Sequence, residues 1–98
     1  MPTENLIFYE QTNKLLVTVP DAFARREESV LSWVWREEVE VGAEIEAGSE
    51  VADIQWDNNE REAIAAPANC SGKIKAVNRD ILFENLPYAP PQNLLALE

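Results

Sequence analysis

The sequence predicts an all-β fold, a small barrel or sandwich built from short strands. Runs rich in β-branched and aromatic residues recur along the chain, and turn residues separate them about every eight to twelve positions. The only helix signal is brief, because Asp21 caps at most one or two turns that end by Glu28. Ninety-eight residues correspond to one small domain with one thin core.

Two strands are expected at the start of the chain. Leu6–Tyr9 and Leu15–Val19 are β-rich, and residues 11–13 between them favour a hairpin turn. We expect residues 1–14 to form an N-terminal extension or an extra strand, and residues 15–98 to form the single domain. The first segment is apolar enough to need cover, either from its own barrel or from a second copy in a homo-oligomer.

The clearest alternation in the chain runs from Leu31 to Val41. Apolar residues share one parity, interrupted at Glu37, and the other parity is mostly charged. A period of two predicts one long strand, or two strands with a bulge or corner near Glu37, with one face in water. The apolar parity, which we expect to pack inward, consists of Leu31, Trp33, Trp35, Val39 and Val41.

The second half of the chain contains shorter strands and a faint internal repeat. Strands are expected after Gly48, at residues 63–67 and 72–77, and in the tail Leu94–Leu97. Residues 42–55 can be laid on residues 85–98, which places Val51 on Leu94 and Ile54 on Leu97. Two similar halves explain this match, and the alternative is chance similarity between short β segments.

The composition narrows the classes of partner. The chain has 8 basic and 18 acidic residues, a net charge of -10. Nucleic acids and anionic membrane surfaces repel such a field, so we expect neither as a partner. A protein with a basic surface is the electrostatic complement. The alternative is that the acidic surface serves only solubility.

The histidine and cysteine content and the apolar runs of the chain indicate which reactive groups it has and in which compartment it is expected. Histidine is absent and Cys70 is the single cysteine, so the commonest general base and an intrachain disulfide are both missing. The sequence shows no secretory signal pattern and no apolar run of the roughly 20 residues that span a bilayer. We therefore expect a cytoplasmic protein.

Three segments in order resemble the lipoyl/biotinyl carrier domain family. Val17-Thr-Val-Pro-Asp21 is similar to the opening strand of that family. Val41-Gly-Ala-Glu-Ile-Glu-Ala-Gly-Ser-Glu-Val-Ala-Asp-Ile54 resembles its central glycine-punctuated pattern, and Ala66-Pro67 with Ser71-Gly72 resembles the element after its carrier hairpin. The resemblance implies a barrel-sandwich hybrid, a flattened β-barrel of two sheets with pseudo-twofold halves. It also implies a lysine at the tip of the hairpin that carries lipoate or biotin.

That lysine is missing here. Alignment from the left places Asn58 at the attachment position, and alignment from Pro67 and Gly72 places Arg61 there. The two registers differ by three residues, which predicts a turn longer than that of the family. Asparagine is a poor nucleophile, and the guanidinium of arginine stays protonated. We therefore expect no prosthetic group and no enzymatic activity, but a non-catalytic interaction or assembly module.

An alternative to that module keeps the carrier role. Of the three lysines in the chain, Lys14 lies near the N-terminus, whereas Lys73 and Lys75 follow Gly72 in an expected strand. A carrier subunit of a multienzyme complex with a non-standard attachment site at Lys73 or Lys75 therefore stays open.

The hairpin tip is the candidate interaction site. Trp56 at its base is either an interface anchor or a ring folded onto the end of the barrel. Asp57 with Glu60 or Glu62 gives a carboxylate pair without fixed geometry, and the spacing matches no calcium loop, so neither catalysis nor metal binding is expected. Cys70 is expected to fill the core. The interaction residues predicted are Trp56, Asp57, Asn58, Asn59, Glu60 and Arg61.

Overall fold

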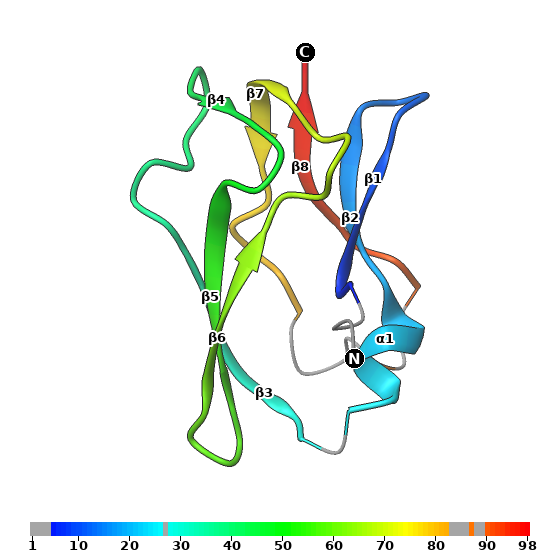
Figure 1. Cartoon of the computed structure of the whole chain (residues 1–98), viewed down its shortest axis with the longest axis vertical. Helices are drawn as coiled ribbons and strands as arrows, with labels where there is room; N and C mark the ends of the chain where they lie inside the picture. The colour runs from blue at the N-terminus through cyan, green and yellow to red at the C-terminus, as the bar shows by residue number, and fades with distance from the viewer. Residues whose placement is uncertain (1–4, 27, 83–86, 88–89) are drawn as a thin grey trace.

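The computed structural model describes residues 5–26, 28–82, 87 and 90–98, and within them the chain is almost entirely β. Eight strands form two antiparallel sheets, in the orders β1-β2-β8-β7-β4 and β3-β5-β6 (Figure 1), and one short helix lies between β2 and β3 in the chain. The all-β prediction is confirmed. The elements are β1 (Ile7–Glu10), β2 (Leu15–Thr18), α1 (Pro20–Ala24), β3 (Val30–Trp35), β4 (Glu44–Ile45), β5 (Glu50–Trp56), β6 (Arg61–Ala65), β7 (Gly72–Val77) and β8 (Asn93–Leu97).

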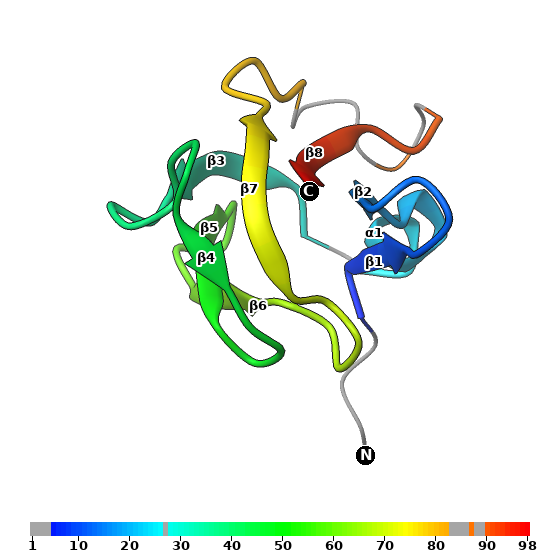
Figure 2. The ribbon, with the colours of Figure 1, turned by 90° about the horizontal axis from the view of Figure 1, so that it is seen from above.

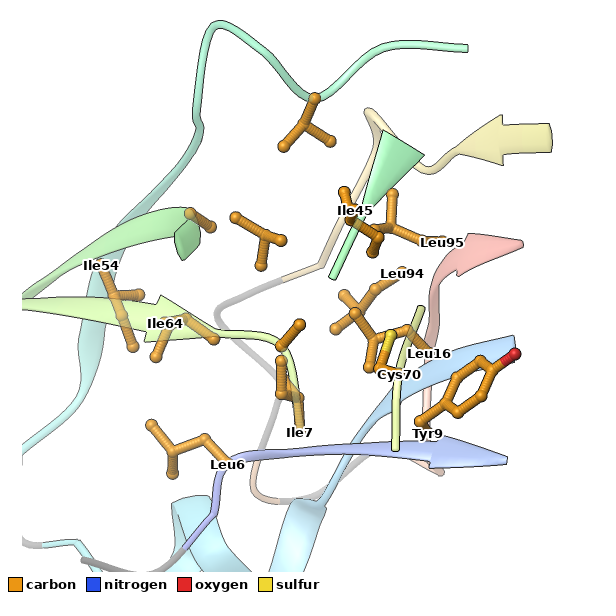
Figure 3. Close-up of a cluster of buried hydrophobic side chains, with 14 of the residues drawn as sticks. Leu6, Ile7, Tyr9, Leu16, Ile45, Ile54, Ile64, Cys70, Leu94 and Leu95 are labelled. Carbon is orange, nitrogen blue, oxygen red and sulfur yellow. The ribbon is translucent and has the colours of Figure 1, made fainter. Parts of the chain in front are cut away.

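The two sheets curve around one core (Figures 1 and 2). Alternate residues of each strand point inward, so the core receives side chains from both sheets. Figure 3 shows part of this cluster, with Cys70 next to Leu16. The largest fully buried side chains are Trp56, Leu16, Ile54, Ile74, Leu94, Leu95 and Val51.

The N-terminal segment forms an added strand at the edge of the larger sheet. β1 pairs with β2 in an antiparallel register, and Leu6, Ile7 and Tyr9 are buried. The Glu10 carboxylate closes the hairpin by accepting the backbone N–H groups of Thr12 at 2.9 Å and Asn13 at 2.8 Å. These hydrogen bonds, the one from Asn13 foremost, lower the pKa of Glu10 because they favour its charged form.

The long strand expected between Leu31 and Val41 is wrong in its extent and partly wrong in its face. β3 ends at Trp35, and a register shift between Val30 and Ser32 leaves Leu31 outside the pairing with β5. Because a bulge inverts the alternation, Leu31 is 50% exposed, and Val41, beyond the strand, is 66% exposed. Val39 is buried, as predicted.

Trp33 and Trp35 do turn toward the core, where they are half-buried. Their rings meet edge to face with centroids 5.5 Å apart, an arrangement that suits the aromatic quadrupole. The Trp35 indole N–H also donates to the carbonyl oxygen of Asn78 at 2.9 Å. This bond ties β3 to the segment that follows β7.

The helix has the predicted length of one to two turns, but Val19 is its N-cap and Asp21 lies in its first turn, so the predicted cap at Asp21 is wrong. α1 contains five residues, begins at Pro20 and buries Ala22 and Phe23. Proline at the start of a helix costs nothing, because the first N–H groups have no intrahelical acceptor. The helix places the Phe23 ring against Trp56, the last residue of β5.

The internal repeat relates the central strands of the two sheets. β5 is the middle strand of the smaller sheet and β8 of the larger one. The matched residues Val51 and Leu94 are each 1% exposed, and Ile54 and Leu97 are also buried. The match of Gly42 and Ile45 with Asn85 and Tyr88 lies outside the described residues.

Candidate functional site: the β5–β6 hairpin

The tip of the hairpin is a compact turn of Asp57, Asn58 and Asn59. The N–H of Asn59 donates to the carbonyl oxygen of Trp56 at 3.0 Å, and the N–H of Trp56 donates to that of Glu60 at 2.8 Å. Asn59 has a φ of 70°, the left-handed conformation that asparagine tolerates. A type I turn followed by such a residue is a common way to join two strands.

Side chains and neighbouring backbone fix this turn further. The Asn58 Oδ1 atom accepts the N–H of Glu60 at 3.0 Å, and the Asn58 amide donates to Glu28 at 3.3 Å. The N–H of Asp57 donates to the carbonyl oxygen of Ser29 at 2.9 Å. The tip is therefore tied to the segment that precedes β3.

The turn is short, and it ends before one of the two candidate attachment positions. Arg61 is the first residue of β6 and pairs with Gln55 across the ladder, so it lies outside the turn. Asn58 is the turn residue. The two alignment registers disagreed because sequence spacing does not show where the loop ends. Of the two candidate attachment positions, only Asn58 lies in the turn.

Trp56 is not available as an exposed interface anchor, which corrects that part of the predicted site. Its side chain is 1% exposed and packs against Phe23, with ring centroids 6.3 Å apart. The guanidinium carbon of Arg26 lies 4.2 Å from the Trp56 ring centroid, a cation–π contact. The ring therefore closes the end of the core.

Glu62 completes this buried base of the hairpin. Its Oε1 atom accepts the Trp56 indole N–H at 3.3 Å and lies 3.1 Å from Nη2 of Arg26. Glu62 is thus held in a structural ion pair rather than facing Asp57 as a catalytic partner. The exposed residues of the predicted interaction site are Asp57, Asn58, Asn59, Glu60 and Arg61.

The remaining reactive groups do not gather at the hairpin. Cys70 is fully buried, and burial raises the pKa of its thiol to about 11, which suppresses the nucleophilic thiolate. Lys73 and Lys75 are exposed on β7, in the other sheet. Within the described ranges, no group of three or more acidic, cysteine or histidine side chains is placed to hold a metal ion.

A groove that the sequence did not reveal runs beside β6. It has a volume of about 720 Å³ and is lined by the start of β1, by β6 and by the loop that follows β6. These segments lie side by side in Figure 2. The only sequence signal was the run of alanines at positions 63, 65, 66 and 68, whose small side chains leave space. The lining residues are Asn5, Leu6, Ile7 and residues 62–68.

Comparison with known proteins adds no relative to this description. No protein-family model, no curated protein and no solved structure matches the chain. No helix in the described ranges is long and apolar enough to cross a membrane.

Proposed function

We propose that the chain is a lipoyl/biotinyl-like domain that carries no prosthetic group and acts as a protein-interaction or assembly module. The proposal includes a barrel-sandwich hybrid with pseudo-twofold halves. Its support is topological: β5 lies between β3 and β6, and β8 lies between β7 and β2. The alignment that places residues 42–55 on residues 85–98 also places β3 on β7. Each sheet thus contains a central strand between two antiparallel neighbours, β3-β5-β6 in one and β7-β8-β2 in the other.

The observation that carries the functional proposal is the turn at Asn58. The hairpin has the compact exposed tip that a carrier domain needs, but its turn residue has a carboxamide in place of an amine. A carboxamide nitrogen does not form the amide bond by which lipoate or biotin is attached. Because Asp57 and Glu60 flank Asn58 on a chain of net charge -10, the proposed partner presents a basic surface. We also propose a cytoplasmic location.

Intact-mass measurement after co-expression with lipoate and biotin ligases tests this proposal. The wild-type chain is expected to keep its unmodified mass. The Asn58→Lys variant places an amine in the turn and is expected to gain one prosthetic group. The matched control, Arg61→Lys, places the same amine on strand β6 and is expected to remain unmodified.

The same experiment separates the carrier alternative. A mass gain by the wild-type chain, mapped to Lys73 or Lys75, would establish a non-standard attachment site and overturn the proposal. Failure of Asn58→Lys to be modified would instead contradict the equivalence between this turn and the carrier turn of the family.

A further inference from the structure

We propose that the free edge of β6 binds an extended, basic segment of a partner protein as an added strand. This inference rests on the proposed interaction function and assigns it a surface and a partner chemistry. β6 is the last strand of its sheet, and in the part of the chain that the structure describes no strand pairs with its outer side. An open strand edge presents unpaired backbone donors and acceptors, which another backbone satisfies.

The hydrogen-bond ladder identifies the groups on that edge. The N–H of Trp56 donates to the carbonyl oxygen of Glu60, and the N–H of Ala66 donates to that of Ser49. Bonding alternates along an antiparallel pair, so Glu60, Glu62 and Ile64 face β5. The backbone N–H and C=O groups of Ala63 and Ala65 therefore point away from β5, toward the open side.

The start of β1 supplies an apolar floor next to this edge. Leu6, Ile7 and Ile64 are each at most 5% exposed and lie between β1 and β6 (Figure 3). The N–H of Val19 donates to the carbonyl oxygen of Leu6, so alternation directs the backbone groups of Ile7 away from β2. Both walls of the 720 Å³ groove thus offer backbone groups, and its floor offers apolar side chains.

β6 begins with the charged residues Arg61 and Glu62, and its ladder with β5 shifts register between Glu50 and Ala52. The stretch that follows Glu62 in β6 lacks the other features that commonly block strand addition. These other features are lysine or proline residues and a very short strand. β4, at the edge of the other sheet, is only two residues long and is too short to accept a peptide strand. The stretch from Ala63 to Ala65 contains only alanine and isoleucine. Because β6 contains five residues and strands pair residue by residue, it can pair with about five residues of a peptide.

Charge selects the class of peptide. The chain has a net charge of -10, and the exposed carboxylates of Asp57 and Glu60 lie just before β6, where they outnumber the exposed guanidinium of Arg61 at the first position of the strand. An acidic segment would be repelled, whereas lysine or arginine residues flanking the paired stretch would be attracted. The occupant is therefore an extended peptide with small or β-branched residues at its centre and basic residues at its ends.

Selection of random nine-residue peptides against the full chain tests the proposal. Enriched peptides should carry basic ends, and their affinity should fall at least about tenfold for Ala63→Pro, which removes the outward N–H but no bond to β5. The control Ala63→Thr keeps that N–H and should stay within about twofold, because its side chain leaves the edge intact. Equal binding by both variants, or no enrichment at all, would overturn the proposal.

A second measurement uses the wild-type protein and avoids any folding defect of the proline variant. N-methylation of the peptide residues that face β6 should weaken binding about tenfold, and methylation of the alternate residues should weaken it much less. Amide hydrogen exchange should slow at Ala63 and Ala65 on binding. If these amides are already protected from exchange in the free chain, the proposal is contradicted. Faster exchange after deletion of residues 1–4 would then identify the chain's own start as the occupant of the edge. Faster exchange after dilution would identify a second copy of the chain.

The outcomes for edge and function remain distinguishable. If peptide binding changes the NMR chemical shifts of Asp57–Glu60 alone, the binding site on the β6 edge is overturned, but the proposed interaction function is not. A prosthetic group found on the wild-type chain would overturn the proposed function, whatever the peptide result.

Discussion

The tip and the base of the β5–β6 hairpin differ in almost every physical respect, although they are adjacent in sequence. The base is buried, with Trp56 enclosed by Phe23, Arg26 and Glu62. The tip is exposed, and its order comes from backbone hydrogen bonds, the side chain of Asn58 and the left-handed backbone conformation of Asn59. The packing of this hairpin against the core is therefore concentrated at its base, whereas its tip residues stay exposed to solvent.

Trp56→Ala should have the largest effect. Truncating a fully buried tryptophan costs about 3–5 kcal/mol, which is a large share of the stability of a small domain. Chemical denaturation of the variant measures this loss. Trp56→Phe keeps an apolar ring but leaves Glu62 without its indole donor, so it should cost clearly less than Trp56→Ala. An equal loss for the two variants would contradict packing as the main contribution.

Asn59→Val should be the most costly change at the tip. A β-branched residue in the left-handed conformation costs about 1–2 kcal/mol, whereas Asn59→Gly should be nearly neutral because glycine enters that region freely. Thermal unfolding of the two variants gives the difference. If Asn59→Val and Asn59→Gly were equally stable, the turn would not hold its positive φ in solution.

Arg26→Met should cost about 1 kcal/mol, since it keeps the aliphatic stem but removes the cation–π contact with Trp56 and the ion pair with Glu62. Both contacts are partly exposed, so this loss should be smaller in 1 M salt than in dilute buffer. Urea denaturation at the two salt concentrations measures the change. A loss that is unaffected by salt would assign the effect to packing alone.

The double variant Asp57→Asn with Glu60→Gln should have the smallest effect on stability, within about 0.5 kcal/mol, because both side chains are exposed. The same variant should slow association with a basic partner peptide, because it removes charge beside β6. Stopped-flow kinetics at low salt measure that rate. A large loss of stability would show that the tip carries part of the fold after all.

Local sequence signals predicted the strands well but not the location of their ends. Alternation and turn residues were sufficient for the tail strand and for the hairpin of β5 and β6. The alternation wrongly placed Leu31 and Val41 in the core. The bulge at Leu31 and the end of β3 at Trp35 are set by pairing with β5, and a local sequence pattern does not show that pairing. For the same reason, local spacing did not show that Arg61 belongs to β6 and not to the turn.

Burial of Trp56 and the groove beside β6 required tertiary structure. Phe23 and Arg26, which cover the Trp56 ring, lie about thirty residues earlier, and the sequence offered no way to pair them with it. The groove arises where two strand edges from distant parts of the chain approach each other. Residues that act through the same local turn, such as Asn58, were identified from sequence, whereas residues brought together by the sheets were not.

The burial of Cys70 has a practical consequence for measuring the motions of this protein. With a thiol pKa of about 11, against 9.0 for an ordinary thiol, the native chain holds about one hundredth of the usual thiolate at pH 8. Cys70 is the single cysteine, so any labelling by a thiol reagent reports one position. Because the side chain is fully enclosed, the rate of labelling under native conditions measures how often the core opens.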